Sequence, residues 1–207
     1  MQPEAGTLEI ALRAAQRGEV TAFNTLVVAY QRQLYNVCFR TLGNADDAAD
    51  ATQDAFISAF RSVKTFQGPP SGLRAWLLRI AVNACYDQLR RRQRRPTDSL
   101  DHLATPDSEG DLNPADRLAD PAPGPELRSL TTETARTIQA AIDRLSPDQR
   151  MTVILCDVQG FSYDEVAQAM EVELGTVKSR LSRARAQLRD LLAQKGELPI
   201  RTQRLSP

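Results

Sequence analysis

The sequence has few of the residues that build metal centres or disulfide frameworks. Its 207 residues include one histidine, His102, and three widely separated cysteines. Cys38, Cys85 and Cys156 show no metal-ligand spacing, and an odd, sparse set indicates reduced thiols in a cytoplasmic protein. We therefore expect no metal and no cofactor, and little material for acid–base catalysis by imidazole.

Long apolar runs are also missing. No segment approaches the roughly 18 apolar residues that a membrane-spanning helix needs, so we expect no membrane insertion. Residues 1–19 mix charged with apolar side chains and lack a small-residue cleavage site, which argues against a secretory signal. Strand-like runs are short and lie within helical spacing. The sequence therefore predicts an all-α protein in the cytoplasm.

The net charge is zero, but the charges are segregated. Residues 1–95 carry 13 Lys and Arg against 8 Asp and Glu, whereas residues 96–130 carry 2 against 8. That acidic stretch also holds six of the twelve prolines, and it cannot bury enough apolar surface to offset the entropy of ordering it. We predict two small helical domains, 1–95 and 129–195, joined by a flexible acidic linker at 96–128 and followed by a tail at 196–207.

Apolar periodicity and helix-end signals locate the helices. In the first domain we expect them at about 8–17, 22–42, 44–64 and 73–94. Gly18 and Gly43 end the first two of these helices, and Asn44 begins the third. In the second domain we expect them at about 130–145, 147–157, 162–170 and 174–193. Capping boxes at Ser146 and Ser162 predict where two of these helices begin.

The C-terminal domain has helix-turn-helix spacing, in which a short capped helix and a tight turn precede a longer basic helix. Within residues 174–195 there are six bases and one acid. Cations neutralise phosphates, Arg pairs with guanine, and short hydroxyls permit close approach to a major groove. A solvated basic face is the alternative. The side chains that we expect at DNA, opposite a buried stripe that begins at Val177, are Lys178, Ser179, Ser182, Arg183 and Arg185.

A second set of residues lies on the helix at 73–94. Trp76, Asn83, Asp87, Arg90 and Arg94 are spaced so that they share one face. An indole offers a stacking surface, an amide reads the edge of an unpaired base, and the arginines contact phosphates. This combination suits a strand with splayed-out bases. Taken singly, the tryptophan would be a core aromatic and the arginines a solvated helix end.

A third set is acidic. Asp47, Asp50 and Asp54 recur at spacings of three and four, which places one stripe of carboxylates on a helix. Carboxylates also bind hard cations, but no nucleophile lies nearby and the pattern is not an EF-hand loop. We therefore favour a docking surface for a basic partner, with a solvated face as the alternative.

These motifs together resemble the extracytoplasmic-function (ECF) group of bacterial RNA polymerase sigma factors, over about residues 20–193. DDAADATQDAF resembles the block that docks on the polymerase β′ clamp, and FQGPPSGLRAWLLRIAVNACYDQLRRRQRR resembles the segment that reads the −10 promoter element. DPAPGPE resembles the end of the linker, and the segment from LSPDQR to RAQLR resembles the domain that reads the −35 element. Four motifs in this order are highly specific.

The resemblance implies roles for individual residues. For the polymerase clamp it implies Asp47, Asp50, Gln53 and Asp54. For the −10 element it implies that Phe66 and Asn83 lie beside a flipped base and that Arg90 and Arg91 contact the DNA backbone. The helix face described above adds Trp76 and Asp87 to this set. For the −35 element it adds Thr176, at a phosphate, to the residues already named. It also implies a non-enzymatic initiation factor whose partners are core RNA polymerase (β′ clamp and β subunits), promoter DNA and an anti-sigma factor.

Three positions depart from the family pattern. Ala49 stands where Glu is frequent, Pro69 and Pro70 stiffen the loop before the −10 segment, and Glu171 replaces the Gly that is common in the helix-turn-helix turn. Since Gly tolerates a left-handed backbone, Glu171 implies mild strain or a shifted turn.

Two other functions remain open from the residues alone. A dimeric helix-turn-helix regulator would bind a palindromic site without polymerase, and a metal enzyme would need the three aspartates to converge on a cation. We also hypothesise that the free protein binds promoter DNA poorly, because the linker and the packing of the domains occlude both DNA-reading surfaces.

Overall fold

A computed structural model describes residues 5–94 and 125–194, with side chains described at 6–94 and 134–194. Within these ranges every regular element is helical and there is no strand, which confirms the all-α prediction. No helix in the described ranges is long and apolar enough to cross a membrane.

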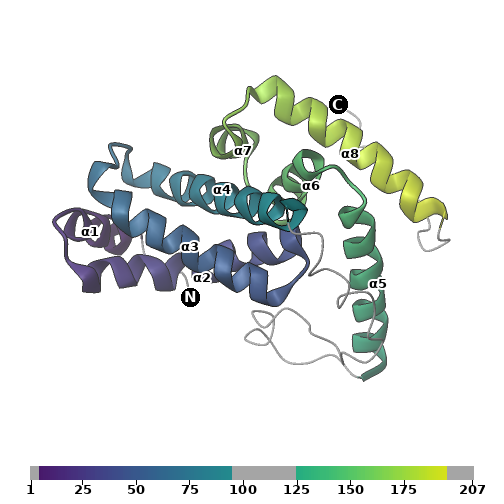
Figure 1. Ribbon diagram of the computed structural model, residues 1–207, viewed down its shortest axis with the longest axis horizontal. Helices are drawn as coiled ribbons and strands as arrows, with labels where there is room; N and C mark the ends of the chain where they lie inside the picture. Colours follow the sequence, from purple (N-terminus) through teal and green to yellow (C-terminus); the bar gives the residue numbers. More distant parts are fainter. Residues whose placement is uncertain (1–4, 95–124, 195–207) are drawn as a thin grey trace.

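Four helices form the N-terminal unit, and they lie side by side in Figure 1. They are α1 (Ala5–Gln16), α2 (Val20–Leu42), α3 (Ala45–Ser62) and α4 (Leu73–Arg94). Two short 3₁₀ turns, Val63–Thr65 and Pro70–Gly72, connect α3 to α4. These helices coincide with the predicted ones to within about three residues at each end.

The helix ends form as the local sequence predicts. Gly43 adopts a left-handed conformation with φ 70°, and its N–H donates to the Phe39 carbonyl at 2.8 Å, which ends α2. The Asn44 side chain then accepts a hydrogen bond from the Asp47 N–H at 3.0 Å and begins α3. Because the two signals are adjacent, α2 and α3 reverse direction within two residues.

The C-terminal unit contains α5 (Pro125–Asp143), α6 (Pro147–Val153), α7 (Tyr163–Met170) and α8 (Leu174–Gln194). A single π-helical turn, Ile154–Val158, follows α6 and was not expected. The capping box at Ser162 is complete, whereas at Ser146 only the side-chain cap to the Gln149 N–H forms. The chain between α4 and α5, which includes most of the expected linker and His102, lies outside the described residues, as does the expected tail.

One helix boundary was predicted wrongly. α5 begins at Pro125, so residues 125–128, which we had assigned to the linker, are helical. Proline suits the first position of a helix because its fixed φ is helical and its missing N–H has no partner there. Overall composition concealed this local signal.

The two units share part of one apolar core. The N-terminal core contains Leu34, Val37, Leu77 and other side chains of α2–α4, and side chains of the C-terminal unit extend it. The latter are Met151, Leu155, Phe161, Val166, Ala169 and Val177. A smaller cluster of Leu145, Val153, Leu181 and Ala184 holds α6 and α8 together. The helical units therefore pack against each other, which places α7 beside α4.

Candidate functional site

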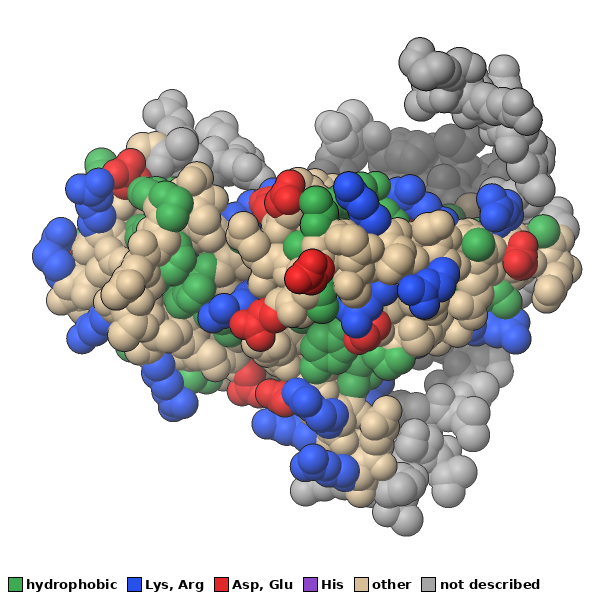
Figure 2. Space-filling view, turned by 90° about the horizontal axis from the view of Figure 1, so that it is seen from above, with side chains coloured by type: hydrophobic (Ala, Val, Ile, Leu, Met, Phe, Trp, Pro, Cys, Tyr) green, Lys and Arg blue, Asp and Glu red, His purple; other side chains and the backbone are tan. Residues whose placement is uncertain are grey.

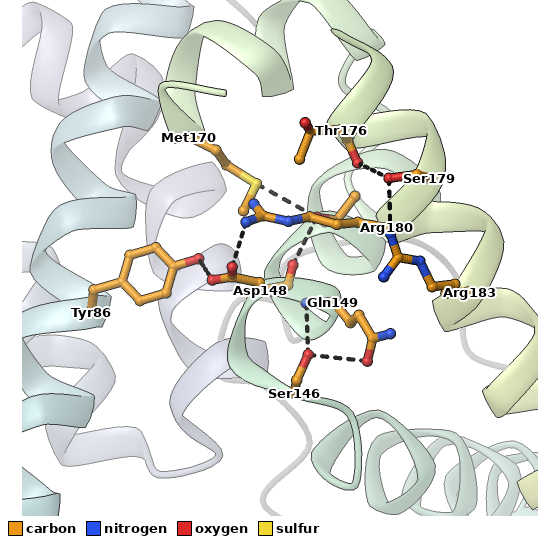
Figure 3. A network of polar contacts seen from close by, with 10 residues as sticks. Tyr86, Ser146, Asp148, Gln149, Met170, Thr176, Ser179, Arg180 and Arg183 are labelled. Atoms are coloured by element: carbon orange, nitrogen blue, oxygen red, sulfur yellow. Dashed lines mark hydrogen bonds and ion pairs between the residues drawn. The ribbon is translucent and has the colours of Figure 1, made fainter. Parts of the chain in front are cut away.

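The exposed face of α8 carries most of the predicted −35 residues. Lys178, Ser182 and Arg183 are exposed, while Thr176 and Ser179 are half-buried at the start of the helix. The Ser179 hydroxyl donates to the Thr176 carbonyl at 3.0 Å and accepts from Arg183 at 3.3 Å (Figure 3). The structure thus brings these five side chains together on one face.

Arg185 differs from its neighbours because it already has an anionic partner. Its Nε donates to Asp157 at 2.9 Å, and this hydrogen bond raises the pKa of the Arg185 guanidinium above its ordinary value. Asp157 lies on the π-helical turn, so the pair fixes α8 to that turn. Arg185 is consequently less available to DNA than Lys178 or Arg183.

A polar hub joins α8 to α4 through Asp148 of α6. The Tyr86 hydroxyl donates to Asp148 at 2.9 Å, and the Arg180 guanidinium bonds the other carboxylate oxygen (Figure 3). Burial, followed by the hydrogen bond to Asp148, raises the pKa of Tyr86. These residues come from three helices far apart in sequence, and sequence reasoning did not single them out.

The predicted −10 face is present on α4. Asn83, Asp87, Arg90 and Arg94 are exposed, whereas Trp76 is half-buried at the start of the helix. Arg90 and Asp87 form an ion pair at 2.8 Å, so two of the predicted DNA-contacting side chains bond each other in the free protein.

The loop at residues 66–72, which we call the 66–72 loop, begins beside that face. The Phe66 and Trp76 rings lie 5.1 Å apart, tilted by 47°. Gly68 passes under the Phe66 ring so closely that a Cβ there would lie 2.6 Å from Cζ of Phe66. Phe66 is therefore held against Trp76, which brings two of the predicted −10 residues together.

The acidic stripe on α3 is partly neutralised by α4. Asp47 forms an ion pair with Arg92 and accepts from Gln88 at 3.4 Å. Asp54 lies 3.7 Å from Arg91. The other two predicted docking residues, Asp50 and Gln53, are exposed. No group of three or more candidate ligands in the described residues could hold a metal ion.

Next to this stripe lies an apolar groove between α2 and α3, with a volume of about 840 Å³. Gln53 and Ala49 contribute to its wall, which connects it to the stripe. Ile57 and Phe60 of α3 are about 40% exposed, and Val20 of α2 is 56% exposed. Phe60 lines this open groove, with its ring against that of Phe23.

Ion pairs accompany the apolar packing between the two units. Arg74 of α4 bonds Glu165 of α7 at 3.0 Å and lies over the Phe161 ring at 4.0 Å. Arg79 bonds Glu171 at 3.1 Å. In Figure 2 basic side chains are dispersed over the face shown, with acidic ones near its middle, so no single-sign patch covers it.

Packing of the units leaves most predicted DNA-contacting side chains exposed. Part of our occlusion hypothesis therefore changes: the packing does not bury these side chains, but it fixes the two surfaces relative to each other.

Comparisons with known proteins match each of the two helical units separately. A family model described as Sigma-70 region 2 matches residues 26–95, and one described as Sigma-70, region 4 matches residues 135–188. The chain is 38% identical to the ECF RNA polymerase sigma factor SigE of Mycolicibacterium smegmatis over 84% of its own length and 62% of that relative. It is 35% identical to the ECF RNA polymerase sigma-E factor of Escherichia coli K12, over 86% of this chain and 91% of the relative.

A solved structure has a similar fold. The sigma factor RpoE from Bartonella quintana, in a co-crystal with the anti-sigma factor NepR, superposes with a TM-score of 0.60. The two chains are 29% identical, and the match covers 84% of this chain and 98% of that one.

Proposed function

The chain belongs to the ECF sigma factors of bacterial RNA polymerase, and on that premise we propose how its surfaces divide the work of promoter-specific initiation. Members of this family are initiation factors and not enzymes. The chain would act in the cytoplasm, where it recruits core RNA polymerase to promoter DNA.

For the polymerase, we propose that the acidic stripe and the adjoining α2–α3 groove form one docking surface for the β′ clamp. Exposed Asp50 and Gln53 supply polar contacts, and Ile57 and Phe60 supply apolar area that water now covers. An interface with an apolar centre and a charged rim fits this combination. The C-terminal unit would contact the β subunit.

For the −10 element, the exposed face of α4 and the 66–72 loop would capture the unpaired strand. Asn83 reads a base edge, Phe66 and Trp76 provide aromatic surface, and Arg90 and Arg91 contact phosphates. Capture of a flipped base offsets the few kcal/mol lost when that base unstacks. Melting then follows from binding and needs no catalytic group.

For the −35 element, α8 would enter the major groove with the face that carries Lys178 and Arg183. Arg pairs with guanine through two hydrogen bonds, and each such pair contributes roughly 1–3 kcal/mol of discrimination. Arg185 would position α8 through Asp157 and contact DNA less directly.

An anti-sigma factor would control the chain. The support is the similar fold of the Bartonella quintana sigma factor, whose solved structure contains such a partner. Such a partner would cover the exposed α2–α3 groove and the exposed faces of α4 and α8.

The observation that carries the proposal is that one chain presents an exposed apolar groove and two separate exposed faces, on α4 and α8, that carry the residues expected at DNA. A dimeric helix-turn-helix regulator gives no purpose to the groove or to the α4 face. The deciding experiment is run-off transcription with core RNA polymerase, this protein and a pool of random promoter fragments. Start sites that share two spaced elements would support the proposal, and absence of polymerase binding would overturn it.

A further inference from the structure

A hydrogen bond ties the first helix to the 66–72 loop. The Gln16 side-chain amide, at the last residue of α1, donates to the Phe66 carbonyl at 2.8 Å, and the contact is partly buried. The two residues are 50 positions apart. α1 lies before residue 26, where the match to the sigma region 2 family begins.

The position of Gln16 is set by the core. Ala11, Leu12 and Ala15 of α1 are buried in the N-terminal unit. Directly after Gln16 the chain turns away, with Gly18 at φ 97° and its N–H bonded to the Ala15 carbonyl at 2.9 Å. The donor amide is thus presented from a rigid support.

The loop is restrained from its other side as well. The Phe66 ring packs on Trp76 and over Gly68, and the Gly72 N–H closes a turn onto the Pro69 carbonyl at 2.8 Å. The bond from Gln16 holds the backbone carbonyl at the loop's first residue, while the Phe66 N–H bonds the Val63 carbonyl at 3.2 Å. Loss of the Gln16 bond therefore leaves the Phe66 carbonyl without this restraint, and Phe66 is held by its N–H and its ring contacts.

We propose that Gln16 is a positioning residue for promoter recognition, which holds the Phe66 carbonyl so that the 66–72 loop keeps the shape that selects the −10 base. The proposal rests on the proposed function, because it assigns this loop to the −10 element. α1 then contributes to promoter specificity through the loop, although none of the residues that we assign to DNA lies on α1.

The test uses variants that remove the donor. In Gln16→Glu the carboxylate accepts hydrogen bonds but does not donate them, and in Gln16→Ala the side chain is truncated. Thr7→Glu serves as the matched control, since it adds the same charge at an exposed position on α1. All four proteins are purified as full chains.

The first measurement needs no polymerase. Trp76 is the only tryptophan of the chain, and it lies against Phe66, so its fluorescence reports on the loop. We expect both Gln16 variants to shift the Trp76 emission and to raise its quenching by acrylamide, while Thr7→Glu matches the wild type. Unchanged emission in both Gln16 variants would overturn the claim that Gln16 holds the loop.

The second measurement repeats the random-pool run-off selection with each protein and core RNA polymerase. We expect the Gln16 variants to lose about fivefold in discrimination at the −10 base, the ratio that one ordinary hydrogen bond supplies. Preference at the −35 element and affinity for core polymerase should not change. A parallel fall in both preferences would show a merely structural role and overturn the proposal. Failure of the wild type to initiate would overturn the proposed function instead, while the fluorescence would still decide the contact.

Discussion

Glu171 has the one positive φ among the non-glycine residues that the structure describes, 54°. It ends α7 in the turn of the helix-turn-helix unit, where the family pattern favours glycine. Of the two expectations, mild strain or a shifted turn, the left-handed backbone corresponds to the strain. Its side chain also reaches Arg79 of α4 at 3.1 Å. A strained backbone position therefore contributes an ion pair between the two units.

Replacement of Glu171 by glycine should stabilise the protein. A left-handed conformation costs a residue with a Cβ roughly 1–2 kcal/mol, whereas an exposed ion pair contributes about 0–1 kcal/mol. We expect Glu171→Gly to unfold at a higher denaturant concentration than Glu171→Ala, which loses the pair but keeps the strain. Chemical denaturation of the wild type and both variants measures these differences. A Glu171→Gly protein no more stable than the wild type, or than Glu171→Ala, would contradict this account.

Cys156 illustrates how burial controls a thiol. It is half-buried, and burial, then the nearby Asp157, raises its pKa to about 11. The thiolate is the reactive form, so we expect slow alkylation at pH 8 that accelerates toward pH 11. Since the native state holds this proton more tightly than the unfolded chain, the resulting stabilisation is complete below about pH 9 and declines as pH rises toward 11. Mass spectrometry of iodoacetamide adducts measures the alkylation rate of Cys156 at each pH, and rapid labelling at pH 8 would contradict the raised pKa.

Residue positions were predictable where the pattern is local. The exposed face of α8 follows from helical spacing, because side chains opposite a buried stripe must face solvent. Gln16 and Tyr86 were not predictable, because each acts through a contact with a residue at least 50 positions away that no periodicity encodes.

Two ion pairs connect α3 and α4. Arg91 and Arg92 at the end of α4 pair with Asp54 and Asp47 on α3. Arg91, which we assign to DNA, therefore pairs with Asp54, which we assign to polymerase. Binding of either partner would compete with this ion pair, so the two surfaces are linked.

This linkage predicts opposite effects of one substitution. In Arg91→Ala, Asp54 is released for the clamp while a phosphate contact is lost. We expect core polymerase to bind this variant up to a few fold more tightly than the wild type, because exposed ion pairs contribute roughly 0.2–1 kcal/mol. Open complexes on promoter DNA should weaken.

Arg90→Ala is the matched control, because Arg90 pairs with Asp87 and not with the stripe. It should weaken promoter binding without improving polymerase affinity. Anisotropy titrations with core polymerase, with and without promoter DNA, separate the two effects. Identical behaviour of the two variants would refute the linkage.

Helices and most of their ends were predictable from sequence because caps and stop signals act within a few residues. The start of α5 was missed, since the acidic, proline-rich composition around Pro125 outweighed a helix-start signal at one position. The α2–α3 groove was missed for a different reason. Periodicity shows which side of α3 is apolar, but it does not show that Ile57 and Phe60 extend beyond the core.

In the whole molecule, the packing of the two units was beyond sequence reasoning. A segment with linker composition predicts independent domains, whereas apolar side chains of α7 join the core of the N-terminal unit. Figure 1 shows α7 beside α4. Those side chains have ordinary core spacing, so nothing in the pattern distinguishes burial within a domain from burial against its neighbour.

The packed arrangement cannot contact both promoter elements at once. Elements centred near −35 and −10 are about 25 base pairs apart, which at about 3.4 Å per base pair is roughly 85 Å. Helices as long as α4 and α8 measure only about 30 Å, and α7 packs between them. The 30 residues from 95 to 124 span up to about 100 Å when extended, which is sufficient once the units separate.

We therefore expect the α4–α7 contact to open when the chain binds polymerase and promoter. Dyes are attached to cysteines introduced by Thr7→Cys on α1 and Arg189→Cys on α8, both exposed positions, in a Cys156→Ala background. Energy transfer between them reports the separation of the two units. Transfer should be high in the free protein and fall when polymerase and promoter are added together. Tyr86→Phe removes a hydrogen bond between the units while keeping the ring, so it should lower transfer in the free protein and ease opening. Undiminished transfer in a complex that initiates transcription would mean that both elements are read by the packed form, and the distance argument would then be wrong.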